Sequence, residues 1–258
     1  GMRCAAAMRR PPGDPAALRL TAEACRTPAV RGAFDRSADG PWLAEHEAKS
    51  LLRARGIPIV DGRVVADEAD ALAAAAELGG PVAVKLSSPA VQHKAELGGV
   101  ELDLRTPAAV AGAYRRLAPL AARHGGAVLV EQMGEPGVEL IVSARRDAVV
   151  PALLIGLGGV WAEVLDDVVI VPLPVSAARV AAAVVRLRGA ALLTGARRRA
   201  PVDIGAVGEL GSLVGDALLD LDLSLIELNP VLAGPRGAVA VDAVARGRAG
   251  GGASAEQP

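Results

Sequence analysis

The chain has 258 residues, of which 52% are hydrophobic, so it carries enough apolar material for one large domain or two lobes. Its 28 basic residues nearly balance 29 acidic ones and only 2% of the residues are aromatic, which argues against a nucleic-acid-binding protein with basic stripes and stacking platforms. The longest apolar stretch, 148–162, contains a proline and three glycines and is too short to cross a bilayer. We therefore expect a cytoplasmic protein that binds neither a membrane nor nucleic acid.

The two ends of the chain differ in composition from its middle. The first residue is typical of the remnant of an expression tag, and 1–40 mixes alanine, arginine and proline with weak periodicity, which predicts a poorly ordered extension. The organised domain is expected over 41–246, as two lobes of about 41–130 and 131–246. The small residues of 247–258 predict a flexible tail.

Helix and strand patterns alternate along the organised domain. Helices are expected where periodic apolar runs follow capping residues or end at glycine, at 43–54, 67–78, 106–123 and after Ser176 and Asp203. Strands are expected at 81–86, 100–104, 127–132, 138–144, 149–155, 168–171, 223–228 and 238–241. Because short turns join several neighbouring strands, the sheets should be largely antiparallel or mixed, and two α+β lobes are favoured over a doubly wound sheet.

The lysines draw attention to one loop. Only three of the 28 basic residues are lysine (Lys49, Lys85 and Lys94), and in an arginine-rich chain they become candidates for positions where a guanidinium would not serve. Lys85 ends an apolar strand, and the loop after it contains Ser87 and Lys94 and closes at 98–99 with two glycines. Backbone N–H groups of a tight loop together with an ammonium group can hold a phosphate. An ordinary hairpin loop with solvated charges is the alternative.

A second group of polar residues lies near the C-terminal end of the domain. Glu227 and Asn229 are two positions apart on a strand and share a face, and a hairpin would return Asp242 beside them. Carboxylate and amide oxygens suit Mg²⁺, which keeps positions free for substrate phosphates. The alternative is a turn at the Asn-Pro pair with acids at the surface.

A third group follows the strand at 127–132. Glu131, Gln132 and Met133 come at its end, and Glu139 lies on the next strand. These side chains could line a nucleotide cleft between the lobes, with Met133 against the base and the carboxylates near the ribose. A hinge between two hairpins is the alternative.

Taken in order, these segments resemble a known family. They read PVAVKLSSPAVQHKAELGGVEL, VLVEQM, GVEL, GLGGVWAEVLDDV, LLTGARRRAPVD and IELNPV followed by VDA. This series resembles the ATP-grasp β component, or β subunit, of ADP-forming acyl-CoA (acetyl-CoA) synthetases and, more distantly, the β subunit of succinyl-CoA synthetase. The resemblance covers 42–246.

The resemblance implies a fold and a reaction. The fold is ATP-grasp, an α+β arrangement of two lobes that hold ATP or ADP with Mg²⁺ between them. The reaction is the reversible conversion of an acid, CoA and ATP into acyl-CoA, ADP and phosphate through a phosphohistidine. The CoA-binding domain and the domain that carries the main phosphohistidine have no counterpart here, so the resemblance implies a separate α subunit, without which the chain is expected to be inactive.

The resemblance also implies a role for each candidate residue. The residues implied to bind the nucleotide are Lys85, Ser87, Gly98, Gly99, Glu131, Gln132, Met133 and Glu139. Asn229 and Asp242 resemble the Mg²⁺ ligands, and Glu227 would lie beside the phosphorylated histidine. His93 matches a histidine that takes the phosphoryl group before ADP, which suits an imidazole nitrogen near neutral pH. Lys94 would hold the phosphoryl oxygens.

Three positions depart from the family pattern and keep other functions open. Ala90 stands where an acid is expected, Val171 where the family has an arginine, and Arg198 where the family has a glycine. The missing arginine removes a cation that would face phosphate, which makes a non-catalytic nucleotide-binding or regulatory module the first alternative. A stand-alone ATP-grasp carboxylate ligase is the second, although no acid-binding lobe is evident.

Overall fold

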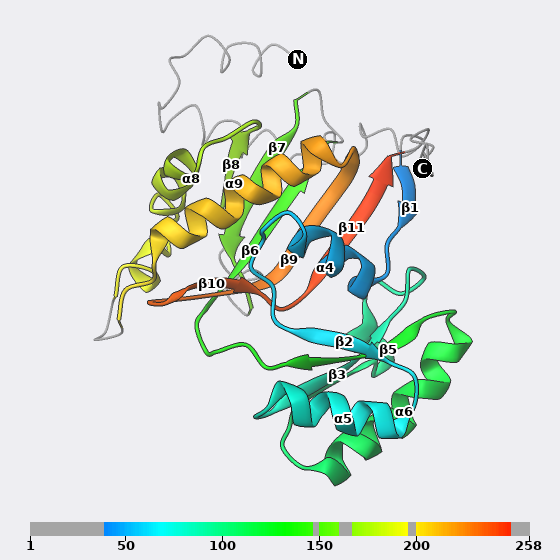
Figure 1. The fold of residues 1–258 in the computed structure, drawn as a ribbon. Coiled ribbons are helices and arrows are strands. Elements are labelled where there is room, and N and C mark those ends of the chain that lie inside the picture. The colour runs from blue at the N-terminus through cyan, green and yellow to red at the C-terminus, as the bar shows by residue number, and fades with distance from the viewer. Residues whose placement is uncertain (1–38, 147–149, 160–166, 196–199, 249–258) are drawn as a thin grey trace.

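The computed structural model describes residues 39–146, 150–159, 167–195 and 200–248, which form two lobes built on separate sheets (Figure 1). All strand pairs of both sheets are antiparallel, as the short turns predicted. None of the helices in these ranges is long and apolar enough to cross a membrane.

The smaller lobe is a four-stranded sheet covered by two helices. Its strands, in spatial order, are β2 (Gly62–Val65), β5 (Ala127–Gln132), β3 (Val82–Ser87) and β4 (Val100–Leu104). Helices α5 (Glu68–Leu78) and α6 (Pro107–Arg123) begin at the predicted caps, since Asp67 accepts a hydrogen bond from the Asp70 N–H and Thr106 from the Ala109 N–H. Both helices pack on the sheet through apolar side chains that include Val84, Leu117 and Val130.

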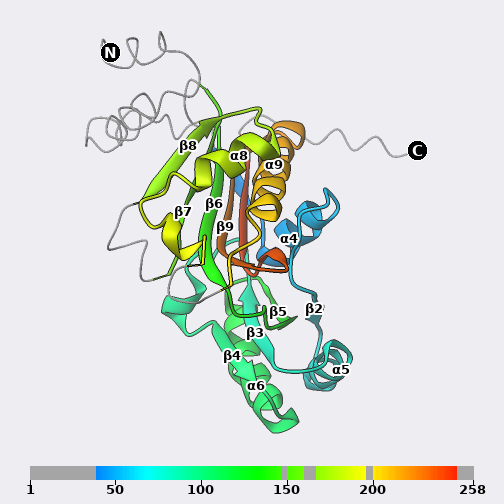
Figure 2. The same cartoon turned by 90° about the vertical axis from the view of Figure 1, so that its left-hand side faces the viewer.

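The larger lobe is a seven-stranded sheet with helices on one face (Figure 2). Its strands run in the order β1 (Asp39–Trp42), β11 (Ala243–Arg248), β9 (Leu223–Gly234), β6 (Val138–Arg145), β7 (Ala152–Leu157) and β8 (Val168–Pro172), and β10 (Gly237–Ala240) pairs with the second half of β9. Helices α8 (Ala177–Val184) and α9 (Ile204–Asp220) bury Val180, Leu210 and Val214 against this sheet. The opposite face is left to form one wall of the site.

The predicted division into lobes of about 41–130 and 131–246 is wrong at the start of the first lobe, because 41–53 packs with the second. Strand β1 and helix α4 (Glu45–Arg53) precede the smaller lobe in sequence but pack with the larger one, because α4 buries Ala48 and Leu52 in its core and β1 pairs with β11. Strand β5 stays in the smaller sheet through Gln132. The chain thus starts in the larger lobe, builds the smaller one, and returns.

Two further predictions about the chain ends need correction. Strand β1 begins at Asp39, inside the expected 1–40 extension, and β11 continues to Arg248, inside the expected 247–258 tail. The two ends pair with each other, since Asp39 lies opposite Arg248. A strand whose partner lies about 200 residues away in the chain has little local sequence pattern to predict it. Its stabilisation comes from the pairing and not from its own side chains.

Asp167, just before β8, holds the turn after α8 in place. Its carboxylate is buried and accepts hydrogen bonds from the Arg188 and Gly189 N–H groups at 3.0 and 2.8 Å. Asp167→Ala leaves both donors without their acceptor and is expected to lower the free energy of unfolding by about 3 kcal/mol in a denaturant titration. The exposed acid Asp216 on α9 is the control, and Asp216→Ala should cost no more than about 0.5 kcal/mol. Equal losses in the two variants would contradict the assignment.

Candidate functional site

A cavity of about 730 Å³ lies between the two lobes, within the size range of small-molecule and cofactor sites. Its walls come from β3, η2 (Lys94–Leu97), β4 and β5 of the smaller lobe and from β9, β11 and the β10–β11 junction of the larger one. Of the thirteen site residues predicted from sequence, ten line it: Lys85, His93, Lys94, Glu131, Gln132, Met133, Glu139, Glu227, Asn229 and Asp242.

The other three predicted residues, Ser87, Gly98 and Gly99, do not line this cavity. Ser87 is fully buried, and its Oγ lies 2.8 Å from the Nδ1 of His46 and accepts a hydrogen bond from the His46 N–H. The N–H groups of Gly98 and Gly99 donate to the carbonyls of Ala95 and Lys94, within the same loop. These two glycines therefore shape the turn after η2 and do not present free N–H groups to a phosphate.

Three polar residues reach the cavity from β9 and the β10–β11 junction. Glu227 and Asn229 lie on one face of β9. Ile226 and Leu228, which alternate with them, lie on the other face and are buried in the core. The chain returns as the sequence predicted: the Val241 N–H donates to the Pro230 carbonyl, and Asp242 follows at the cavity wall.

Glu139 lies at another part of the wall, and a glycine turn makes room for it. The Gly158 N–H donates to the Glu139 carbonyl at 2.7 Å. A Cβ on Gly159, which has a φ of +58°, would lie 2.5 Å from Oε2 of Glu139. The glycine at 159 thus lets the Glu139 carboxylate lie close to the backbone of this turn.

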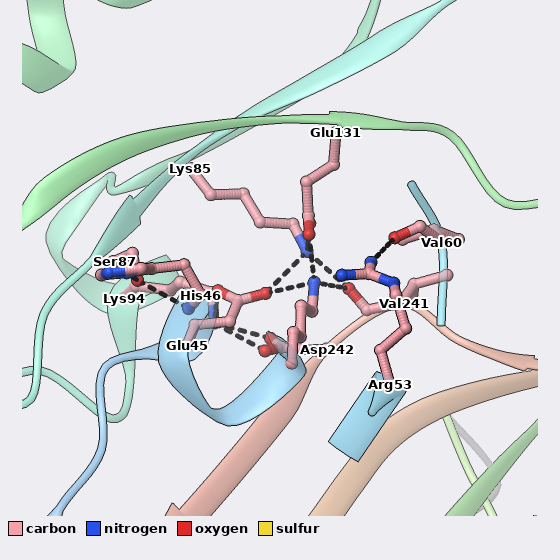
Figure 3. A network of polar contacts seen from close by, with 11 residues as sticks. Glu45, His46, Arg53, Val60, Lys85, Ser87, Lys94, Glu131, Val241 and Asp242 are labelled. Carbon is pink, nitrogen blue, oxygen red and sulfur yellow. Dashed lines mark hydrogen bonds and ion pairs between the residues drawn. The ribbon is translucent and has the colours of Figure 1, made fainter. Parts of the chain in front are cut away.

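The most unusual feature of the site is a cluster of six charged side chains, five of them buried and the sixth, Asp242, partly exposed (Figure 3). It contains every lysine of the chain, Lys49, Lys85 and Lys94, together with Glu45, Glu131 and Asp242. Three ammonium groups and three carboxylates sum to no net charge when all are ionised. Such a cluster is stable only because each charge has a close partner of opposite sign.

Each lysine in the cluster has at least two partners. The Lys49 Nζ lies 2.6 Å from Glu45 and 2.5 Å from Glu131, and the Lys85 Nζ lies 3.1 and 2.7 Å from the same two residues. Both Nζ atoms also donate to the Val241 carbonyl, at 2.9 and 2.6 Å. The backbone between β10 and β11 is thereby joined to two lysines of the cluster.

Lys94 joins the cluster from the other side. Its Nζ lies 2.8 Å from Oε2 of Glu45 and 2.7 Å from Oδ2 of Asp242. Lys94 therefore links η2, in the smaller lobe, to α4 and to the β10–β11 junction of the larger lobe.

Burial and charge have opposite effects on the pKa values of these groups. Burial alone lowers the pKa of Lys85, but the adjoining carboxylates, foremost Glu45 and Glu131, outweigh burial and raise it. Burial likewise lowers the pKa of Lys94, yet Glu45 and Asp242 leave it raised. Lys85 and Lys94 are thus charged at neutral pH, ready to bind an anion.

The carboxylates differ from one another in the same way. Burial raises the pKa of Glu45, but three lysines around it lower the pKa well below its usual value. The pKa of Asp242 is raised, first by burial and then by the like charge of Glu45. Asp242, a quarter exposed at the cavity wall, is therefore held less firmly as an anion than Glu45 is.

Sequence reasoning assigned no role in the site to Glu45 or Lys49, which α4 contributes. They lie four residues apart on one helix face and are 6% and 2% exposed. The scarcity of lysine was a usable signal for Lys49, but it singled out only the segment around Lys85 and Lys94. Nothing in the local pattern of α4 indicates that it packs against the loop of the other lobe.

The three departures from the family pattern fall in different surroundings. Val171 is 3% exposed and lies in the core of the larger lobe, so this position offers the cavity no cation. Ala90 is exposed in the loop before η2. Arg198 lies outside the described residues.

The residues present fit a magnesium ion that arrives with its nucleotide. Among the residues that the structure describes, no three His, Cys, Asp or Glu side chains are grouped to hold a metal ion. Asp242 and Asn229 supply oxygen atoms to one cavity wall, which matches the habit of Mg²⁺ to bind one or two protein ligands plus substrate phosphates. Asp242 is already paired with Lys94, so a metal ion would compete with that ion pair.

Comparison with known proteins places the chain in a family. The ATP-grasp domain family matches residues 36–246. The β subunit of ADP-forming acetate–CoA ligase I from Pyrococcus furiosus is 32% identical over 208 residues, which are 78% of this chain and 90% of that subunit. A trans-feruloyl-CoA synthase is 35% identical, but the chain spans only 30% of its length.

Solved structures agree with this placement. A dinucleotide-forming acetyl-coenzyme A synthetase 1 from Ca. Korarchaeum cryptofilum, in complex with coenzyme A and Ca-AMPCP, superposes with a TM-score of 0.74 and 35% identity, covering 80% of this chain and 93% of that one. A complex of the same enzyme with coenzyme A and Mg-AMPPCP gives a TM-score of 0.69 and 33% identity, covering 88% of this chain and 97% of that one. The predicted fold, family and ligase class are confirmed. The chain belongs to the ATP-grasp family, among the β subunits of ADP-forming acetate–CoA ligases.

Proposed function

We propose that the chain binds ATP or ADP with Mg²⁺ in the cavity between its lobes and acts as the nucleotide-binding subunit of an ADP-forming acyl-CoA synthetase. A separate CoA-binding α subunit would supply acyl-CoA chemistry and the main phosphohistidine. The observation that carries the proposal is the convergence of ten predicted site residues, from both lobes, on one cavity. The related synthetase with coenzyme A and Mg-AMPPCP supports the choice of nucleotide.

The cluster marks where the phosphates would lie. Lys85 and Lys94 line the cavity as charged groups, and Asn229 and Asp242 line it as oxygen donors. The ammonium groups would bind phosphate oxygens and offset their charge. Bound Mg²⁺ would supply further charge neutralisation, and Lys94 would then exchange its contact with Asp242 for a phosphate oxygen.

The base and ribose would lie toward the segment that joins β5 to β6. Gln132 and Met133 line that end of the cavity with Gly134 and Leu232, and Glu139 adds a carboxylate for ribose hydroxyl groups. Gly134 leaves room for the Leu232 side chain, because a Cβ at this position would lie 2.6 Å from a Leu232 methyl group. Apolar side chains such as Met133 and Leu232, bordered by a carboxylate, are suited to a nucleoside.

His93 would carry the phosphoryl group. It is exposed at the start of η2, next to Lys94, and lines the cavity. In the direction of ATP formation, a ring nitrogen of His93 would form a bond to phosphorus as the bond from phosphorus to the partner's histidine nitrogen breaks. Transfer onward to a terminal oxygen of ADP would restore the free imidazole. Glu227, on the opposite wall, would orient the incoming phosphohistidine.

Calorimetric titration of the purified chain with ATP and ADP tests the proposal. We expect micromolar affinity that falls at least about tenfold when Mg²⁺ is chelated, since one amide and one carboxylate cannot replace the metal's charge. Asn229→Ala should lose most of this Mg²⁺ dependence. The exposed acid Asp216, remote on α9, provides the control variant Asp216→Asn, which should bind as the wild type does. A wild-type chain that binds no nucleotide at millimolar concentration would refute the proposal.

One observation favours a second candidate function, a nucleotide-binding module without turnover. Val171 occupies the place of the family's arginine and points no charge at the cavity, because it lies in the core. Nucleotide binding requires only the groups around Lys85 and Lys94, whereas transfer requires every cation that steadies the moving phosphoryl group. Nucleotide binding without any phosphoryl transfer would support this candidate.

A further inference from the structure

Glu45 is the carboxylate that touches all three lysines. Its Oε1 lies 2.6 Å from Lys49 and 3.1 Å from Lys85, and its Oε2 lies 2.8 Å from Lys94. Its side chain is 5% exposed, and it does not line the main cavity, whereas Lys85 and Lys94 do. Glu45 thus contacts the two cavity-lining ammonium groups from the protein interior.

These contacts cross from one lobe to the other. Glu45 lies on the first turn of α4 in the larger lobe, and Lys85 and Lys94 come from β3 and η2 of the smaller lobe (Figure 3). A pair that served only to stabilise α4 would be complete with Lys49, four residues away on the same helix. The second carboxylate oxygen, directed at Lys94, serves no purpose within the helix.

We propose that Glu45 is a positioning residue of the nucleotide site, which holds the ammonium groups of Lys85 and Lys94 side by side at the cavity wall. This inference rests on the proposed function. Two buried ammonium groups repel each other, and one carboxylate bonded to both removes that repulsion and fixes the two side chains in one arrangement. If Asp242 exchanged Lys94 for Mg²⁺, Glu45 would remain as the counter-charge of Lys94.

Lys49 holds Glu45 in this role. Besides its contact with Glu45, Lys49 reaches Glu131 at 2.5 Å and the Val241 carbonyl at 2.9 Å, and it does not line the main cavity. Lys49 therefore links the Glu45 carboxylate to the β10–β11 junction. This contact holds the Glu45 carboxylate in its position behind Lys85 and Lys94. The cluster thus has two parts. Glu45 and Lys49, both on α4, do not line the main cavity, whereas Lys85, Lys94, Glu131 and Asp242 do.

Lysine-selective ¹⁵N labelling tests the proposal directly, because the chain has only three lysines and all belong to the cluster. Glu45→Gln keeps the shape of the side chain and removes its charge. In the wild type we expect three resolved, slowly exchanging ammonium signals, and in Glu45→Gln the Lys85 and Lys94 signals should shift and broaden. The affinity for Mg²⁺·ATP, measured on the same samples, should fall about tenfold or more.

Glu47→Gln is the matched control on the same helix. Glu47 accepts a hydrogen bond from the Ala44 N–H and has no part in the cluster, so this variant should keep all three signals and bind Mg²⁺·ATP within about twofold of the wild type. If Glu45→Gln fails to fold, Glu45→Asp gives the same test, since its shorter side chain cannot reach both lysines.

The outcomes separate this inference from the proposed function. Unchanged lysine signals and unchanged or tighter Mg²⁺·ATP binding in Glu45→Gln would overturn the positioning role. A wild-type chain that shows the three signals and their predicted response in Glu45→Gln, yet binds no nucleotide, would refute the proposed function and leave the contacts of Glu45 established. The proposal is supported only if Glu45→Gln, unlike Glu47→Gln, both perturbs the Lys85 and Lys94 signals and weakens Mg²⁺·ATP binding.

Discussion

Lys85→Met is expected to reduce the affinity for Mg²⁺·ATP by about 100-fold or more, or roughly 3 kcal/mol. Lys85 is one of two charged lysines at the cavity wall, and methionine fills similar space without a charge. The same change should lower the free energy of unfolding by about 3 kcal/mol, because Glu45 and Glu131 lose a partner while buried. Calorimetry gives the first quantity and a denaturant titration the second.

A double variant separates binding from stability. Lys85→Met together with Glu131→Gln removes one charge of each sign, which leaves two lysines and two carboxylates in the cluster. We expect this variant to regain most of the lost stability, because no buried charge is left in excess. Its nucleotide affinity should stay low. Recovery of affinity along with stability would mean that Lys85 supports the fold and does not bind phosphate.

Much of the fold could be predicted from local signals. Asp67, Thr106 and Asp203 begin α5, α6 and α9 where their side chains were expected to cap, and each accepts the hydrogen bond that defines a cap. Strand β5 has the limits that its apolar run predicts. These features depend on residues within one turn or one strand. A short stretch of sequence is therefore enough to predict them.

The errors share a different physical cause. The lobe boundary, the start of β1 and the burial of Glu45 all depend on contacts between residues far apart in the chain. Helix α4 has an ordinary pattern of charges in its first turn, and only its position beside β3 and η2 turns Glu45 and Lys49 into buried groups. No short-range rule predicts which charged helix face will be buried against another lobe.

The sequence predicted most of the residues that line the cavity, but it did not predict which backbone groups are free to bind a ligand. Residues placed on a strand face by their spacing, such as Glu227 and Asn229 on β9, reach the cavity as strand geometry requires, and so does Glu139 on β6. The glycines at 98–99 looked like a phosphate loop, yet their N–H groups bond within the loop. A glycine pair indicates a tight turn, and only the structure decides whether the turn presents its N–H groups to a ligand or closes on itself.

His93→Ala is expected to abolish phosphoryl transfer to the chain while leaving Mg²⁺·ATP affinity within about threefold of the wild type. His93 is exposed at the cavity wall and makes none of the ion pairs of the cluster, so its removal should not disturb Lys85 or Lys94. Incubation with Mg²⁺ and γ-³²P-labelled ATP should label the wild-type chain with an acid-labile, base-stable phosphoryl group, as expected of a phosphohistidine. The variant should retain less than about 1% of that label.

His124→Asn is the control for this experiment, because His124 is the C-cap of α6 and its backbone N–H and C=O make hydrogen bonds that the substitution retains. That variant should be labelled like the wild type. Label that persists in His93→Ala would place the phosphoryl group on another residue and remove His93 from the transfer. A wild-type chain that binds Mg²⁺·ATP tightly but takes no label would instead favour the nucleotide-binding module, in which Val171 supplies no cation to the cavity.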